Sequence, residues 1–234
     1  YTTLFRSQQV GFIIGGLTRV LLKTFFHRFI NMFYKKHYYY FKGALSEKLC
    51  DDIVERGMDD NPITALTGGY STIIPRTKKE KKELFDKRNS SVSWIDEAWV
   101  KKELQPYIDR ANKLAGWNFD IEDSEPCQFT IYNKGQYYGW HNDSSGVYYE
   151  SEKMNGLIRK LSVTVSLSHP HEYEGGMLEF DTQPGDKSFI IKCKEILPRG
   201  SICVFPSYTR HRVSPVTKGR RLSLVQWNLG KEWR

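Results

Sequence analysis

Residues 160–168 read KLSVTVSLS, and from Leu161 onward apolar and hydroxyl-bearing side chains alternate without a break. Successive side chains of a β-strand point to opposite faces, so this alternation predicts a strand with one apolar and one hydroxylated face. The hydroxylated face would either meet solvent or line the inside of a barrel. In a barrel whose interior holds a polar ligand, Thr164 is our candidate for a pocket-lining residue.

Short runs of similar texture continue on both sides of this strand, separated by Gly, Pro, Asn and Asp. An α-helix would need longer runs with a period of 3.6 residues. The chain after Gly116 therefore predicts an all-β sandwich or barrel, behind a helical flank. The other runs are QFTIYN (128–133), QYYGWH (136–141), VYY (147–149), GMLEF (176–180), SFIIKC (188–193), SICVFP (201–206), RHRVS (210–214) and RLSLVQWNL (221–229).

Helical patterns precede these strands. After a short strand and turn in YYYFKGALS, residues 46–58 form a predicted helix that starts at Ser46. Residues 96–114 have helical spacing, and Pro106 is expected to split or kink that helix. The lysine-rich residues 76–88 are predicted to be a solvated loop or ragged helix.

The domain organisation follows from these patterns. We predict one domain over residues 37–234, with helical support over 37–125 and a β core over 126–230.

The net charge of +8 is concentrated in one segment. Residues 1–36 hold six basic residues and no acid, which leaves 29 basic and 27 acidic residues for the other 198 positions. A nucleic-acid interface needs clustered Lys and Arg. The near-neutral domain therefore argues against a nucleic-acid partner, including a demethylase that acts on nucleic acids.

Residues 1–36 form a basic, apolar leader of uncertain origin. We consider three interpretations: an amphipathic membrane-surface helix, a targeting segment, and vector or translated upstream sequence. A membrane partner is expected only if the leader is native. No run of about 18 uncharged apolar residues supports a transmembrane helix.

Four scattered cysteines without CxxC spacing are typical of reduced thiols rather than a disulfide framework. We therefore expect a cytoplasmic protein, and the sequence makes no prediction of its oligomeric state.

A candidate metal site lies in Tyr138-Gly-Trp-His141-Asn-Asp143. Residues two apart on an extended backbone face the same side, so His141 and Asp143 could hold one metal ion. His211 starts a later strand-like run and supplies a second imidazole. Two His and one carboxylate with open positions opposite are typical of non-haem Fe(II) oxygenases. A zinc hydrolase with the same three ligands is the competing interpretation.

An oxo-acid co-substrate with a distal carboxylate also needs a fixed cation. Arg221 offers a planar guanidinium, and Ser223 faces the same side of the predicted strand. Arg220 is the immediate competitor as carboxylate anchor, but alternation places it on the opposite face with Leu222. We therefore favour Arg221.

With these residues in place, the chain resembles the 2-oxoglutarate and Fe(II)-dependent dioxygenases, within them the prolyl 4-hydroxylase-like group that includes the PKHD-type hydroxylases. The resemblance covers about residues 37–229. It rests on YYYFKGALSEKLCDDIVERG (38–57), QFTIYNKGQYYGWHND (128–143), LSHPHEYEGGMLEF (167–180) and FPSYTRHRVSPVTKGRRLSLVQWNL (205–229). The family fold is a double-stranded β-helix, or jelly-roll barrel, in agreement with the predicted strands.

The resemblance implies roles for individual residues. His141, Asp143 and His211 look like the iron ligands, and Arg221 looks like the residue that binds the far carboxylate of 2-oxoglutarate. Tyr132 resembles the tyrosine that hydrogen-bonds this co-substrate, and Tyr138 stands where the group often has an aromatic residue near the iron.

The implied cofactors are Fe(II), 2-oxoglutarate and O₂, with ascorbate as external reductant. The implied reaction is hydroxylation of a substrate C–H bond, with succinate and CO₂ as co-products. The closest resemblance favours a prolyl residue in a peptide or protein as substrate. A free amino acid or small metabolite is the second possibility, and a catalytically silent jelly-roll binding protein is the alternative from another class. His169 and His171 also form an H-x-H pair, but without a third ligand we expect them to be exposed turn residues.

Overall fold

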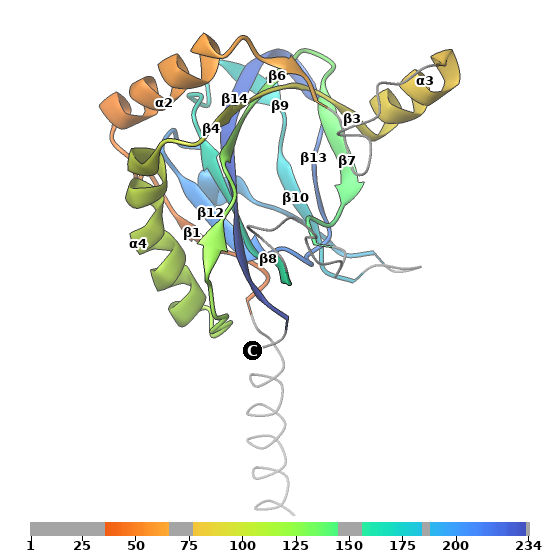
Figure 1. Cartoon of the computed structure of the whole chain (residues 1–234). Helices are drawn as coiled ribbons and strands as arrows, with labels where there is room; N and C mark the ends of the chain where they lie inside the picture. The colour runs from red at the N-terminus through yellow and green to blue at the C-terminus, as the bar shows by residue number, and fades with distance from the viewer. Residues whose placement is uncertain (1–35, 66–76, 145–155, 184–187, 233–234) are drawn as a thin grey trace, which may run out of the picture. The chain divides into compact units, whose positions relative to one another are not determined.

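Two antiparallel sheets face each other in the computed structural model, which describes residues 36–65, 77–144, 156–183 and 188–232 (Figure 1). The smaller sheet has the order β11 (Ile190–Lys192), β10 (Leu178–Asp181), β13 (His211–Val213), β7 (Tyr137–His141) and β3 (Arg88–Asn89). The larger sheet has the order β1 (Tyr39–Phe41), β12 (Ile202–Pro206), β8 (Leu157–Ser166), β14 (Val216–Lys231), β6 (Cys127–Asn133), β4 (Ser91–Ile95) and β2 (Ile63–Thr64). Two further strands pair with β14, namely β5 (Asp123–Ser124) and β9 (Tyr173–Gly175), and a short 3₁₀ helix, η2 (Lys194–Ile196), precedes β12.

The predicted mainly β fold with flanking helices is therefore confirmed. Of the expected strands, VYY (147–149) lies outside the described residues, as does the predicted leader up to residue 35. The segment that we expected to be helical support, residues 37–125, also contributes strands β1 to β5 to the sheets. No helix in the described ranges is both long and apolar enough to cross a membrane.

In the described residues, three α-helices flank the sheets. Helix α2 (Glu47–Asp59) starts as predicted, because the Ser46 side chain caps it by accepting a hydrogen bond from the Leu49 amide. Helix α3 (Lys78–Lys87) is regular, where we expected a loop or ragged helix. Helix α4 (Ala98–Leu114) runs through Pro106 without a break, so the expected split is wrong. The buried side chains of Leu104 and Ile108, on either side of the proline, keep both halves of α4 on the core.

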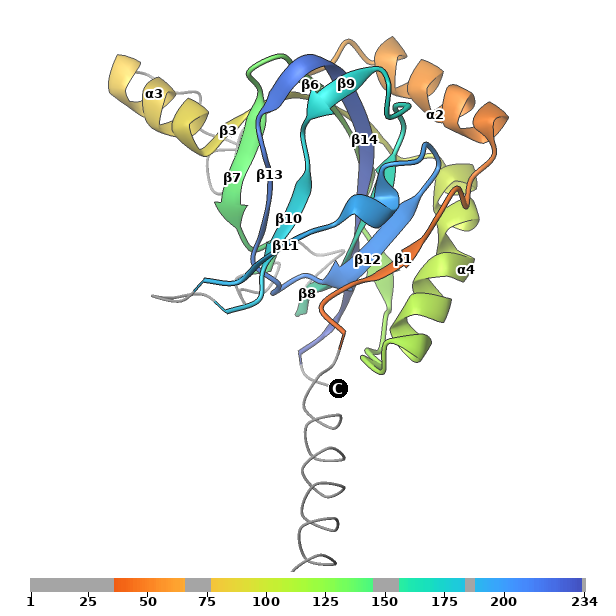
Figure 2. The same cartoon turned by 180° about the vertical axis from the view of Figure 1, so that it is seen from behind.

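Helices α2 and α4 cover the outer face of the larger sheet, whereas α3 projects beside β3 and β7 (Figures 1 and 2). The apolar face of β8 packs into the core beneath these helices, with Leu161, Val163 and Val165 fully buried. Helix α2 packs closely on β6, because a Cβ atom at Gly57 of α2 would collide with the ring of Phe129 on β6.

The hydroxylated face of β8 must then point into the space between the two sheets. Ser162, Thr164 and Ser166 are all buried there, so the interpretation of this face as solvent-exposed is wrong. The packing of two helices on the opposite face explains the difference, because it turns an ordinary amphipathic strand into one that is buried on both sides.

Candidate metal centre and co-substrate pocket

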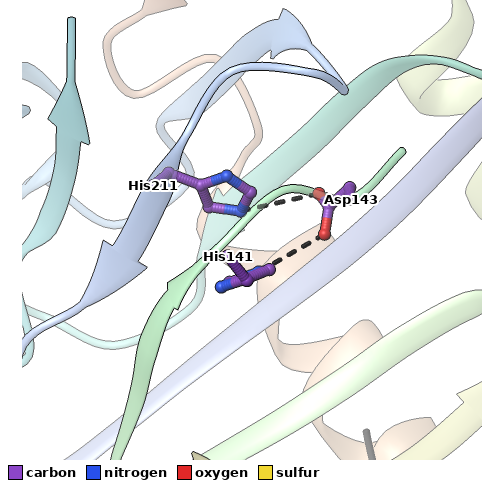
Figure 3. A group of neighbouring side chains, drawn as sticks. All are labelled: His141, Asp143 and His211. Carbon is purple, nitrogen blue, oxygen red and sulfur yellow. Dashed lines mark ion pairs between the residues drawn. The ribbon is translucent and has the colours of Figure 1, made fainter. Parts of the chain in front are cut away.

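The three predicted metal ligands converge between the sheets (Figure 3). His141 ends β7, Asp143 follows two residues later, and His211 begins β13 directly opposite His141 in the smaller sheet. One ligand atom from each side chain lies within 4.8 Å of the others. Strand pairing thus brings together residues that are 70 positions apart in the sequence.

Backbone carbonyls orient both imidazole rings. The Nδ1 atom of His141 lies 2.8 Å from the Gly139 carbonyl oxygen, and the Nδ1 atom of His211 lies 2.8 Å from the Thr209 carbonyl oxygen. A carbonyl can only accept a hydrogen bond, so each Nδ1 carries the proton in the neutral ring. Each Nε2 lone pair is therefore left free to bind a metal ion, and the Nε2 atoms approach the Asp143 carboxylate oxygens at 3.4 and 3.5 Å.

The protonation states also suit metal ligation. Burial alone would raise the pKa of the Asp143 carboxyl, but His211, His141 and Arg159 outweigh it and hold this pKa well below its usual range. Burial lowers the pKa of His211 to about 4, against the opposing effect of Asp143. At neutral pH Asp143 is thus an anion and His211 is a neutral ligand.

A β-bulge explains why Tyr138 shares the pocket with His141. His211 pairs with His141 but Val213 pairs with Tyr138, so β7 has one residue more than β13 in this interval. The extra residue places side chains three positions apart on the same face. The Tyr138 ring stacks on the His141 ring, with 3.5 Å between centroids, and burial raises the pKa of Tyr138 to about 12. The phenol therefore stays protonated.

Arg221 lies deeper in the barrel, next to two predicted partners. Its side chain is 3% exposed, its Nη1 donates to Ser223 Oγ at 3.1 Å, and its guanidinium lies 5.5 Å from the centroid of the Tyr132 ring. Within the described residues, no carboxylate pairs with Arg221. Arg220 is exposed, although the neighbouring residue on its face of β14, Leu222, is buried.

The predicted pocket residues thus come together in one place. A single pocket is lined by His141, Asp143, His211, Tyr132, Tyr138, Thr164 and Ser223, with apolar walls from Leu178, Phe205, Val213 and Val225. Arg221 is not among the lining residues, but it contacts Ser223 and Tyr132, which are. His169 and His171 lie in a turn and form no part of it, and the described residues contain no second His/Cys/Asp/Glu cluster that could hold a metal ion.

Comparison with known proteins agrees with this geometry. The family model described as the 2OG-Fe(II) oxygenase superfamily matches residues 127–228. A PKHD-type hydroxylase of Picosynechococcus sp. is 30% identical over 181 residues, which cover 77% of this chain and 71% of the relative. This chain belongs to the 2OG-Fe(II) oxygenase superfamily. The predicted family is therefore confirmed.

Other relatives in the superfamily are similar over shorter lengths. A PKHD-type hydroxylase of Idiomarina loihiensis is 38% identical over 125 residues, which are 53% of this chain. The match spans about half of that relative, or 51% of its length.

Solved oxygenase structures confirm the jelly-roll fold. The viral collagen prolyl hydroxylase of Paramecium bursaria Chlorella virus-1 superposes with a TM-score of 0.57 at 24% identity, covering 83% of this chain and 97% of that one. The prolyl hydroxylase of Trichoplax adhaerens, solved with a peptide fragment of hypoxia inducible factor, gives a TM-score of 0.58 at 16% identity and covers 82% and 83%. At these identities the likeness concerns the fold alone.

Membership of the superfamily implies Fe(II), 2-oxoglutarate and O₂, and the donor set fits this metal. Two neutral imidazoles and one carboxylate are the ligand combination of non-haem Fe(II) oxygenases, which leave coordination positions open for other ligands. Arg221 fits the co-substrate, because a buried guanidinium without a carboxylate partner suits a ligand carboxylate.

The oxygenase pocket also contains residues that the sequence analysis missed. Arg88 is buried between Ser90 and Gln128, each 2.8 Å from a guanidinium nitrogen, and its guanidinium lies 4.6 Å from the Tyr138 ring centroid. Alternation within QFTIYN could have indicated Gln128, which shares a face with Thr130 and Tyr132. No sequence signal pointed to Arg88, because it directly follows a lysine-rich helix.

A second missed group forms the wall next to Asp143. Arg159 binds Glu125 through two hydrogen bonds of 2.5 and 2.6 Å, and its guanidinium stacks 3.9 Å from the ring centroid of Trp227. It also donates to the Asp143 carbonyl at 3.3 Å. Trp227 itself lines the pocket.

Proposed function

We propose that the protein is an Fe(II)- and 2-oxoglutarate-dependent hydroxylase that acts on a prolyl residue of a peptide or protein. O₂ would be the second co-substrate, succinate and CO₂ the co-products, and ascorbate the external reductant. One observation carries the proposal: the His-Asp-His cluster lines the same pocket as Ser223 and Tyr132, the two residues that contact the buried guanidinium of Arg221.

Each pocket residue has a role in this proposal. His141, Asp143 and His211 would hold Fe(II), and Arg221 would bind the far carboxylate of 2-oxoglutarate with help from Ser223. Tyr132 on β6 and Thr164 on β8 offer hydroxyl groups to the same co-substrate from the strands on either side of β14. With its ligands bound, the metal would supply the oxidising chemistry that cleaves 2-oxoglutarate and hydroxylates a C–H bond. The apolar wall of Leu178, Phe205, Val213 and Val225 excludes water from that chemistry.

The pocket wall next to Asp143 supports a peptide substrate. Trp227 lines the pocket there, and its buried Nε1–H group has no hydrogen-bond partner in the described part of the chain. The prolyl hydroxylases with similar folds, one of them solved with a peptide fragment, give independent support.

Succinate formation tests the reaction. Protein purified anaerobically and loaded with Fe(II) should convert 2-oxoglutarate to succinate when O₂ is admitted, and a Pro-rich peptide should increase the rate. His141→Ala and Asp143→Ala should abolish turnover and metal binding, whereas the exposed-turn variant His171→Ala should behave like the unmodified protein.

The outcomes separate the alternatives. Full activity in either ligand variant would disprove the metal site. Stimulation by free proline or another metabolite, but not by peptides, would favour the small-molecule hydroxylase. A protein that binds zinc and produces no succinate would overturn the oxygenase proposal.

We also propose a cytoplasmic location. All four cysteines are free thiols and are buried, so the domain does not depend on an oxidising compartment. Thiol labelling of the denatured natural protein should find the four cysteines reduced, and a stable disulfide in the isolated protein would contradict this location.

A further inference from the structure

Two buried serines connect the candidate ligand Asp143 to the rest of the barrel. Ser162 belongs to β8 of the larger sheet, and Ser207 lies between β12 and β13. Both side chains are 0% exposed. Neither serine was predicted to have a role in the site, and the roles proposed above for other residues do not use them.

The hydroxyl groups form a chain with a fixed direction. Ser162 Oγ donates to Asp143 Oδ2 at 2.7 Å, and Ser162 Oγ lies 2.9 Å from Ser207 Oγ. A hydroxyl group has one proton to donate. Because the ionised carboxylate can only accept, the Ser162 proton is directed at Asp143, and Ser207 must donate to Ser162. Hydrogen bonds that run in one direction strengthen one another.

Backbone hydrogen bonds hold Ser207 in place behind Ser162. The Ser207 carbonyl accepts from the amides of Asp143 and Ser144 at 2.9 and 3.0 Å, and the Ser207 amide donates to the Lys160 carbonyl at 2.9 Å. Ser207 therefore binds the segment that carries Asp143 and also the strand that carries Ser162. The hydroxyl chain starts from a residue that the backbone has already positioned.

From this geometry, and on the basis of the proposed iron site, we infer that Ser162 is a positioning residue for the metal centre. Its hydrogen bond occupies Oδ2 of Asp143 and leaves Oδ1 to serve as the metal ligand, so that the carboxylate binds through one oxygen. Ser207 supports this arrangement by orienting the Ser162 hydroxyl.

Single-oxygen ligation matters for the proposed reaction. Two histidines and one carboxylate oxygen would hold Fe(II) through three ligand atoms and would leave room for the 2-oxo acid and O₂. A carboxylate that rotated to bind through both oxygens would take up part of this room.

Ser162→Ala tests the inference, with Ser166→Ala as a matched control. Ser166 lies on the same face of β8, is 4% exposed, and donates to the Ile196 carbonyl at 2.6 Å rather than to the site. Metal affinity is measured by Mn(II) titration with electron paramagnetic resonance, and the free energy of unfolding by urea titration of metal-free protein. We expect Ser162→Ala to weaken Mn(II) binding about 10- to 100-fold, as is typical when a group that orients a ligand is removed.

The control variant should lose a similar amount of stability but bind Mn(II) within about twofold of the unmodified protein, the margin that we take for a variant outside the site. Equal Mn(II) affinity in the Ser162→Ala and Ser166→Ala variants would overturn the inference. If Ser162→Ala does not fold, Ser207→Ala provides the test. A severalfold loss of Mn(II) affinity in this variant would support the hydrogen-bond chain from Ser207 through Ser162 to Asp143, and unchanged affinity would refute it. If the unmodified protein itself binds no Mn(II), the proposed iron site fails rather than the role of Ser162.

Discussion

Replacing the buried Arg221 by Ala gives the sharpest test of how the pocket binds its co-substrate. Arg221 is 3% exposed, and its neutral neighbours Ser223 and Tyr132 do not compensate the charge of its guanidinium. Without it, the far carboxylate of 2-oxoglutarate would be buried and unpaired. Truncating one member of a buried charge pair costs about 2 to 5 kcal/mol, which is about 30- to 5,000-fold in the dissociation constant.

The matched control is Arg220→Ala. Arg220 has the same chemistry one position earlier on β14, but its side chain lies on the opposite face of the strand from Arg221 and is exposed. We expect this variant to bind 2-oxoglutarate within about twofold of the unmodified protein, because exposed charges contribute little to such an interaction. Both variants remove one positive charge, so a difference between them shows that the position of the guanidinium matters and not only the net charge.

The assay is anaerobic calorimetric titration of 2-oxoglutarate into metal-loaded protein, together with KM and kcat for succinate formation. Arg221→Ala should raise mainly the dissociation constant and the KM for 2-oxoglutarate and leave kcat nearly unchanged, because the far carboxylate does not react. The metal-free Arg221→Ala variant should keep its stability, because the native site buries a cation without a carboxylate partner in the described chain. A larger binding loss in Arg220→Ala, or unchanged binding in Arg221→Ala, would refute the reasoning.

Two further predictions concern backbone space and pH. Gly176→Ala should weaken 2-oxoglutarate binding about tenfold, a loss of about 1.4 kcal/mol, because the new Cβ would lie 2.8 Å from Arg221 Cδ at a φ of +57°. Gly116→Ala, at a φ of +75° with nothing within 4 Å, has the backbone strain alone and should leave binding unchanged, so equal binding losses in both would contradict this explanation. Burial lowers the pKa of His211 to about 4 in the folded protein, whereas its pKa in the unfolded chain is about 6.5. As the pH falls from about 6.5 to 4, His211 is therefore protonated in the unfolded chain but not in the folded protein. The metal-free protein should lose about 3 kcal/mol of stability over this range. Urea unfolding across that range should show a shallower pH slope for His211→Gln, and an identical slope would disprove the assignment.

Much of the fold was predictable because alternation along single strands is a local property. The pattern in residues 160–168 indicated one apolar and one hydroxylated face, and the structure has both. Whether the hydroxylated face was wet or buried depended on helices far away in the sequence, so the strand alone could not decide it. Pro106 shows the same limit in a helix, since tertiary packing of the flanking residues outweighs the local preference of proline.

The site was predictable to the extent that its residues share a strand. Arg221 and Ser223 follow from alternation on β14, and His141 with Asp143 from their spacing. Arg88, Arg159 and Ser162 reach the pocket only through strand pairing and the facing of the two sheets. The β-bulge beside Tyr138 likewise depends on a partner strand, so no local pattern could reveal it.

The hydrogen bonds that orient the two histidines come from main-chain carbonyls two residues earlier on the same segments. The path of each strand thus supplies a constraint on its imidazole that does not depend on the identity of a neighbouring side chain. In such an oxygenase, residues of the substrate-binding surface can be substituted while these backbone hydrogen bonds to the two histidines are kept. This offers a physical explanation of how substrate specificity could change around a constant metal site.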